Sequence, residues 1–234
     1  NPQNFAISDL TGGGFVVTYQ SGSYVYGQRL DASGIKVGGE FMVNTATTGH
    51  HRQSSIDNFG DGGFVVAWVS DGQAPLSGCF VQVFNADGSK NGAPVRVGDI
   101  AGGGPGYDPV VRVFKDNSFI VSWSDGPSTP GQVKFQRYTS AGVALGVPVT
   151  VDPGQVSTIQ PDVVTFADGS FVMAWRSNYI PGAWTEVTVQ SYDANGNAVG
   201  SQTDIPFDGT TYQGRPSLLA LSNGSYALSY LNES

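Results

Sequence analysis

A ten-residue motif recurs five times in this chain and constrains its fold more than any other feature. Each copy runs from an apolar residue through a turn rich in Gly, Asp or Asn into an apolar stretch that ends in Trp or Tyr. The copies are Leu10–Tyr19, Phe59–Trp68, Phe114–Trp123, Phe166–Trp175 and Leu221–Tyr230. The closing aromatic residues are 49, 55, 52 and 55 positions apart, which is typical of one supersecondary unit per repeat.

A glutamine marks a second repeated position. Gln28, Gln82, Gln136 and Gln190 are each 54 positions apart, and each precedes a bulky residue by two positions and two glycines by six and ten positions. Because both anchors share one register, they define repeats at about 1–49, 50–103, 104–156 and 157–210, with a partial repeat at 211–234.

Each repeat reads as four strands. The first precedes the turn, as at 161–166, and Asp-Gly or Asn-Gly supplies the positive φ that a tight hairpin needs. The second is the apolar run after the turn, the third carries the glutamine, and the fourth follows the glycines, as at 40–44. The sequence therefore predicts an all-β fold: a β-propeller domain over residues 1–234, with four-stranded antiparallel blades in four complete repeats plus a half repeat.

The repeated residues are predicted to hold the blades together. We expect the closing aromatic residue to pack between blades and the glutamine to hydrogen-bond backbone left unpaired there. The fifth repeat ends after its second strand. We expect the chain to be a fragment of a longer protein, and the alternatives are an open ring or completion of the last blade by a partner chain.

Composition excludes several classes of partner. The net charge is −8, with 11 basic residues scattered along the chain, so nucleic acid is not an expected partner. No apolar run approaches the roughly 20 residues of a membrane span. The single cysteine, Cys79, excludes an internal disulfide, and we interpret it as a packing residue.

Function is expected in the longer loops. In a propeller the loops between the second and third strands, and between successive blades, share one end, and here they vary in length and content. The candidate ligand-binding residues in or beside them are His50, His51, Tyr107, Arg176, Tyr179, Trp184 and Tyr212. Exposed aromatic side chains on a rigid rim can bind a sugar ring or a protein surface, so a glycan or a protein is the expected partner.

Metal binding is a further hypothesis for these loops. Asp71, Asp108 and Asp125 are the candidate ligands. Residues 103–111 fit the calcium motif G-G-x-G-x-D-x-U-x, but that motif binds calcium through tandem copies and occurs here once, which favours a glycine-rich loop. His50 and His51 are adjacent and should point to opposite faces, which disfavours a transition-metal site. No cofactor is assigned with certainty, and Ca²⁺, including calcium-dependent assembly, stays open.

No catalytic residue can be named from spacing. Glutamate occurs only at Glu40, Glu186 and Glu233, and no pair of carboxylates has the pattern of a glycosidase acid and nucleophile. The adjacent histidines leave no Ser/His/Asp arrangement. We therefore expect the chain not to be an enzyme. The alternative is a secreted, glycosidase-like hydrolase, or an accessory domain of one, with its site at the central funnel.

Four segments carry a resemblance to known proteins. They resemble a repeat of very large secreted bacterial proteins, including adhesins and RTX or hemolysin-type calcium-binding proteins exported by type I secretion. The segments are Asp61–Trp68, Asp168–Trp175, Gln190–Gly196 and Val43–Gly49. The resemblance implies a propeller-like, secreted or cell-surface bacterial module, and it carries over no catalytic residue. The sequence thus favours a non-catalytic, adhesin-like structural or binding module, with glycan or protein bound on the variable loop face.

Overall fold

The fold is entirely antiparallel β-sheet in the part of the chain that the structure describes. The structure is a computed structural model that describes residues 3–71, 77–98, 108–125, 131–151, 158–177, 186–205 and 212–233. No helix occurs in these ranges, and so none that could cross a bilayer. The predicted all-β class is confirmed.

Four sheets contain four strands each, with strands that are consecutive in sequence paired side by side. The first sheet contains β1 (Gln3–Asp9), β2 (Phe15–Ser21), β3 (Tyr24–Leu30) and β4 (Lys36–Met42). The second contains β5 (His51–Asn58), β6 (Phe64–Asp71), β7 (Ser77–Phe84) and β8 (Lys90–Gly98). The third contains β9 (Val110–Val113), β10 (Phe119–Ser124), β11 (Val133–Tyr138) and β12 (Ala144–Thr150), and the fourth contains β13 (Thr158–Thr165), β14 (Phe171–Ser177), β15 (Glu186–Tyr192) and β16 (Ala198–Asp204).

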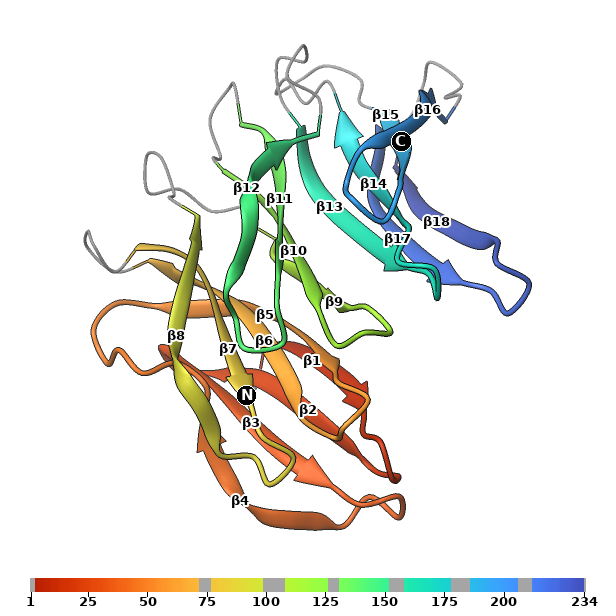
Figure 1. Cartoon of the computed structure of the whole chain (residues 1–234). Helices are drawn as coiled ribbons and strands as arrows, with labels where there is room; N and C mark the ends of the chain where they lie inside the picture. Colours follow the sequence, from red (N-terminus) through yellow and green to blue (C-terminus); the bar gives the residue numbers. More distant parts are fainter. Residues whose placement is uncertain are drawn as a thin grey trace.

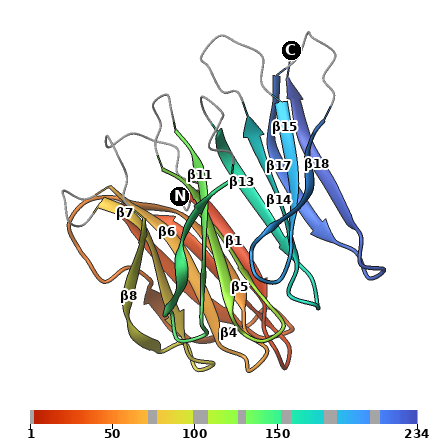
Figure 2. The same cartoon turned by 45° about the horizontal axis from the view of Figure 1, so that its top comes forward.

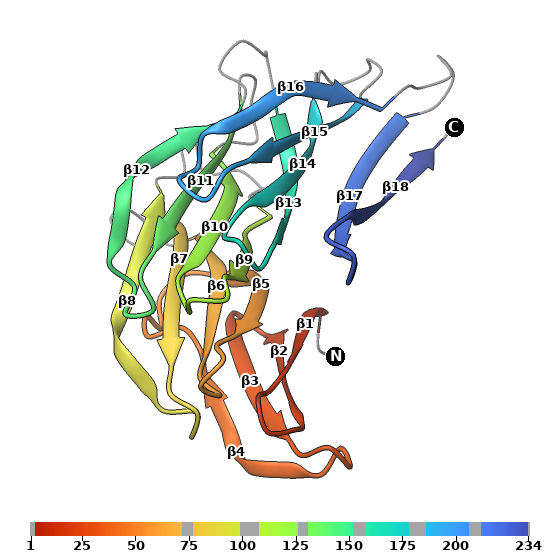
Figure 3. The same cartoon turned by 45° about the vertical axis from the view of Figure 1, so that its right-hand side comes forward.

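The fifth sheet contains two strands, β17 (Tyr212–Ala220) and β18 (Tyr226–Glu233), which confirms the predicted half repeat. Figure 1 shows the sheets as separate blades, and Figure 2 shows the third, fourth and fifth sheets following one another. In Figure 3, β4, β8, β12 and β16 lie along the outer boundary. The first strands of successive blades are neighbours on the inner side, so β1, β5, β9, β13 and β17 line the axis of the propeller.

The turn after each first strand explains the Asp-Gly signature. In the second blade the N–H of Gly62 donates to the carbonyl of Phe59 at 3.0 Å, and Gly62 has φ of 92°. The carboxylate of Asp61 accepts a hydrogen bond from the N–H of Gly63 at 2.9 Å. This turn aspartate is therefore a structural residue, as the sequence predicts.

The repeated glutamines satisfy backbone within their own blade rather than between blades. Gln82 Nε2 donates to the carbonyls of Val83 at 3.0 Å and Gly92 at 3.1 Å. Gly92 lies inside β8 with φ of 74°, where the pairing between β7 and β8 shifts register. The second repeated glycine thus forms a bulge within the fourth strand, which is why that strand begins earlier than predicted: β4 spans Lys36–Met42 instead of 40–44.

The repeated tryptophans pack between blades, as predicted. Trp68, Trp123 and Trp175 are 2%, 2% and 0% exposed. Trp68 packs with residues of the first blade, Trp123 with residues of the second and Trp175 with residues of the third, so each joins its own sheet to the preceding one. Cys79 is fully buried beside Trp123, and desolvation raises the pKa of its thiol, which confirms a packing role.

Candidate functional site

The axis of the propeller contains five polar residues with an unusual backbone conformation. They lie in, or for Asp108 just before, the first strand of each blade, and their φ angles are positive: Asn4 (50°), Gln53 (52°), Asp108 (28°), Gln160 (54°) and Arg215 (48°). In four blades the pairing with the second strand shifts register here, so the chain forms a bulge. Non-glycine residues at positive φ cost about 1–3 kcal/mol each and concentrate at functional sites.

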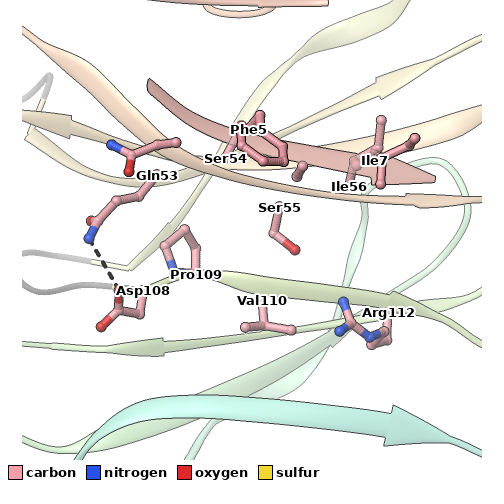
Figure 4. Close-up of a pocket in the computed structure, with 12 residues that line it drawn as sticks. Phe5, Ile7, Gln53, Ser54, Ser55, Ile56, Asp108, Pro109, Val110 and Arg112 are labelled. Carbon is pink, nitrogen blue, oxygen red and sulfur yellow. Dashed lines mark hydrogen bonds between the residues drawn. The ribbon is translucent and has the colours of Figure 1, made fainter. Parts of the chain in front are cut away.

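A pocket of about 490 Å³ lies on the axis between the first three blades. It is lined by Asn4–Ile7 of β1, by Gln53–Ile56 of β5, and by Asp108–Val110 and Arg112 beside or in β9. Figure 4 shows the side chains of Phe5 and Ile7 on one wall and those of Val110 and Arg112 on the opposite wall. The pocket therefore combines apolar surface with a few polar groups, as ligand pockets commonly do.

A chain of hydrogen bonds leads from the rim of the second blade to this pocket. Arg52 binds both carboxylate oxygens of Asp71, through Nε at 2.7 Å and Nη2 at 3.1 Å. Its Nη1 donates to Oε1 of Gln53 at 2.7 Å, and Gln53 Nε2 donates to Oδ1 of Asp108 at 3.1 Å. The network fixes the amide of Gln53 and, through it, the carboxyl group of Asp108.

Asp108 has a carboxyl group that favours its protonated form more than usual. Burial raises the pKa of Asp108, and the positive charges of Arg215 and Arg52 oppose that rise. A carboxyl group in a pocket with a raised pKa can hold a proton and donate it to a bound ligand. This is the chemical property of the pocket that bears most directly on catalysis.

Two other carboxylates near the axis, those of Asp162 and Asp57, accept hydrogen bonds from the backbone, and burial also raises the pKa of Asp57. Asp57 lines a neighbouring pocket together with Asp9. Asp162 accepts hydrogen bonds from the N–H of Leu218 at 2.7 Å and from Arg112 Nη2 at 3.1 Å. Asp57 accepts one from the N–H of Val113 at 2.7 Å. Each thereby satisfies an N–H on the first strand of the next blade. Among the described residues that line the axial pocket, Asp108 is the only carboxylic acid.

The two histidines separate as the sequence predicts. His50 is exposed, with Nδ1 3.2 Å from the hydroxyl of Ser23. His51 begins β5, is 1% exposed and stacks on Tyr24, with the ring centroids 6.2 Å apart. Desolvation lowers the pKa of His51. The two histidine side chains therefore have different surroundings and do not form one binding site together.

The remaining predicted residues have different surroundings. Arg176 lies in β14 and its side chain passes close to Gly214 of β17, between the fourth and fifth blades. Asp125 binds Nζ of Lys134 at 2.6 Å. Tyr107, Tyr179 and Trp184 lie outside the described residues, as do 103–107 of the calcium-like motif and the side chain of Tyr212.

The predicted metal ligands do not form a metal site in the described ranges. Asp71 and Asp108 belong to one network, but Arg52 and Gln53 lie between them, and Asp125 pairs with Lys134. No group of three or more His, Cys, Asp or Glu side chains could hold an ion among the residues that the structure describes. Calcium binding stays an untested hypothesis.

Most of the axial residues at positive φ were not predicted from the sequence. Asp108 was predicted, but as a metal ligand. Asn4 and Gln53, which line the pocket, and Gln160 and Arg215, which belong to the last two blades, were not predicted. A signal was present, because each of these five residues lies fifteen positions before the closing aromatic residue of its repeat. A polar residue at one fixed position of every repeat, next to the axis, is the pattern that could have located the site.

No protein-family model and no curated protein sequence matches this chain. Several solved structures do. One is a protein of unknown function from Dyadobacter fermentans (TM-score 0.68, 13% identity, covering 98% of this chain and 74% of that one). Another is an α-L-arabinofuranosidase from Fusarium graminearum, in complex with an iminosugar inhibitor (TM-score 0.66, 14% identity, 97% and 74% covered). A third is an endo-arabinase from Bacteroides thetaiotaomicron (TM-score 0.56, 12% identity, 97% and 88% covered).

These comparisons establish the propeller fold and correct one expectation. The arabinofuranosidase and the endo-arabinase are propeller glycosidases. The expectation that the chain is not an enzyme is therefore wrong. The repeats do not exclude catalysis, because proteins with the same fold hydrolyse glycosides. A pair of carboxylates at a fixed short spacing is not the pattern of such a site, because a propeller assembles its axial site from residues about 50 positions apart.

Proposed function

We propose that this chain is a glycoside hydrolase, or the propeller part of one, that binds a glycan in the axial pocket and cleaves it with Asp108 as general acid. One observation carries the proposal: a carboxyl group with a raised pKa lines a pocket on the axis of a propeller, held by Gln53 at a strained backbone position. A general acid must be protonated at the working pH, and burial favours that form.

An arabinose-containing glycan is the substrate class that the comparisons support. The arabinofuranosidase and the endo-arabinase share this fold over 97% of the chain. Arg112 in the pocket wall and the amides of Asn4 and Gln53 supply hydrogen bonds for sugar hydroxyls, while Phe5 and Ile7 offer an apolar wall. We also propose, from the resemblance to secreted bacterial repeats, that the protein acts outside the cell.

The hydrolytic reaction needs protonation of the glycosidic oxygen and stabilisation of the positive charge that develops at the sugar. Asp108 supplies the proton from its side of the pocket. A second carboxylate would act as base or nucleophile in the usual mechanisms. A glycan-binding site without hydrolysis is the second candidate function, because Asp108 alone among the described lining residues is acidic.

Hydrolysis and binding of linear arabino-oligosaccharides test both candidates. The variant Asp108→Asn keeps an oxygen that can accept the bond from Gln53, and Asn tolerates positive φ, so the fold should persist. We expect a fall in kcat/KM of about 10²–10⁴-fold, the usual contribution of a general acid, with binding retained.

The matched control is Asp125→Asn, the same chemical change at a carboxylate that faces Lys134 away from the pocket lining. It should leave hydrolysis unchanged. Binding without hydrolysis by the wild-type protein would support the binding candidate and reject the enzyme. If neither binding nor hydrolysis occurs, both candidates fail.

A further inference from the structure

A second pocket lies between the first two blades, away from the axis. It has a volume of about 290 Å³ and is lined by Asn44, Thr45, Ala46, His51, Trp68, Ser70, Phe80 and Pro94. Its wall is mostly apolar and aromatic, and Trp68 and Phe80 stack with centroids 5.8 Å apart. None of the described lining residues carries a carboxylate, an ammonium or a guanidinium group.

Three residues that line this pocket have a buried side-chain polar atom without a hydrogen-bond partner in the part of the chain that the structure describes: His51, Trp68 and Ser70. The Nε1 atoms of Trp123 and Trp175 are in the same state as that of Trp68, so His51 and Ser70 are the two that distinguish this pocket.

Ser70 is 2% exposed and His51 is 1% exposed. The hydroxyl of Ser70 and both ring nitrogens of His51 lack a partner of normal distance and angle among the described residues, although backbone at Ala46 and Thr48 lies close enough to the ring to favour its protonated form. Buried polar groups are normally satisfied, so each of these needs an explanation.

The repeats supply that explanation for His51. At the same position in the fourth and fifth blades, Thr158 and Gln213 accept a hydrogen bond from a backbone N–H of the preceding blade, that of Val133 at 2.6 Å and that of Val187 at 3.1 Å. The corresponding N–H in the first blade belongs to Val25.

At the interface between the first and second blades, the N–H of Val25 is bound by Asn44 instead of by His51. Asn44 Oδ1 accepts the N–H of Val25 at 2.9 Å, and Asn44 Nδ2 donates to the carbonyl of Ala46 at 2.7 Å. Asn44 thus performs the structural task that the residue at the His51 position performs elsewhere. His51 is released from the interface bond and lines the pocket instead.

Ser70 departs from its repeat in the same way. The corresponding serine of the fourth blade is Ser177, which is 1% exposed. Its hydroxyl lies 2.7 Å from that of Thr188 and donates to the carbonyl of Glu186 at 3.3 Å. The hydroxyl of Ser70 has no such bond, and Ser70 is one of the residues that line the pocket. Two neighbouring positions therefore lose their structural partners at one blade interface.

We propose that this pocket is a second ligand site, which binds one uncharged sugar residue. Desolvation favours the neutral imidazole of His51, with one donor and one acceptor nitrogen, and the hydroxyl of Ser70 both donates and accepts. These groups match vicinal sugar hydroxyls, while the apolar wall matches the C–H face of a sugar ring. A charged ligand is disfavoured, because nothing in the described lining compensates its loss of hydration.

The test is saturation-transfer NMR with neutral methyl glycosides of arabinose, xylose, galactose and glucose, alongside glucuronic acid and glucosamine as charged probes. The Asp108→Asn background slows turnover at the axis but keeps axial binding, so the comparison of Ser70→Ala with Ser177→Ala assigns the signal to the second pocket. Ser70→Ala removes a hydroxyl without a partner, so stability should be kept, while the affinity for the neutral probe should fall about three- to tenfold, the value of one hydrogen bond.

The matched control is Ser177→Ala, which removes a hydroxyl at the same repeat position and burial but away from the pocket. It should lower stability and leave sugar affinity unchanged. The proposal is overturned if no neutral glycoside binds, if the charged probes bind equally well, or if Ser70→Ala and Ser177→Ala affect binding alike. Hydrolysis at the axis is measured separately, so either site can fail without the other.

Discussion

Replacing Gly98 with Ala tests the close packing between the second and third blades. Gly98 ends β8, and a Cβ built there would lie 2.6, 2.7 and 2.8 Å from three atoms of the Trp123 indole. Ordinary contacts begin near 3.4 Å, so the ring would have to withdraw by about 0.6–0.8 Å. Trp123 is only 2% exposed and is packed against Cys79 and Val97, which leaves it little room to move.

Overpacking of this kind costs about 1–3 kcal/mol of unfolding free energy. For a chain of this length, each kcal/mol shifts the Tm by about 2–4 °C, so Gly98→Ala should lower the Tm by about 2–12 °C. Calorimetry and urea unfolding both measure the effect.

The control is Gly39→Ala in β4. Like Gly98, Gly39 needs no positive φ, but its added Cβ would meet nothing within 4 Å. Its Tm should stay within about 2 °C of the wild-type value, as expected of a surface substitution. The packing argument is refuted if Gly98→Ala is as stable as the wild-type protein, or if Gly39→Ala is destabilised equally.

Two further predictions concern buried polar groups. Desolvation lowers the pKa of His51 below its ordinary value, so below pH 6.5 the unfolded chain takes up a proton that the folded chain resists, and the unfolding free energy should fall on acidification by at most about 1.4 kcal/mol per pH unit. Urea unfolding at a series of pH values should show this component in the His50→Gln variant and not in His51→Gln; an unchanged profile in His51→Gln would contradict the assignment. Replacing Gln82 with Leu should lower the unfolding free energy by about 1–3 kcal/mol, because the carbonyls of Val83 and Gly92 lose their shared donor. Chemical denaturation measures the loss, and a loss under 0.5 kcal/mol would show that the bulge does not need the amide.

The fold could be predicted well from sequence because its determinants are local and repeated. The turn aspartates, the glutamines and the closing tryptophans occupy fixed positions in the repeats, and each has a role that follows from its chemistry, such as Asp61 in its turn and Trp123 between blades. The bulge at Gly92 was not foreseen, because a glycine in a strand reads equally well as the end of a turn.

The sites were less predictable because they arise from contacts between repeats. Asp108 and Gln53 are 55 positions apart and meet only when β5 and β9 become neighbours at the axis. The second pocket depends on Asn44 taking the bond that leaves His51 without its interface role. Neither contact can be recognised from the spacing of residues within one repeat. The composition of the loops therefore led to a predicted site on the loop face instead of at the axis.

The leaving-group dependence of hydrolysis tests the central claim most directly. An acid catalyst matters for an arabino-oligosaccharide, whose departing hydroxyl needs a proton, and matters little for a 2,4-dinitrophenyl arabinofuranoside, whose leaving group departs as an anion. If Asp108 is the general acid, Asp108→Asn should lose about 10²–10⁴-fold in kcat/KM on the oligosaccharide and change little on the dinitrophenyl substrate. An equal loss on both substrates, or no loss on either, would contradict the assignment of the axial pocket as an acid-catalysed glycosidase site.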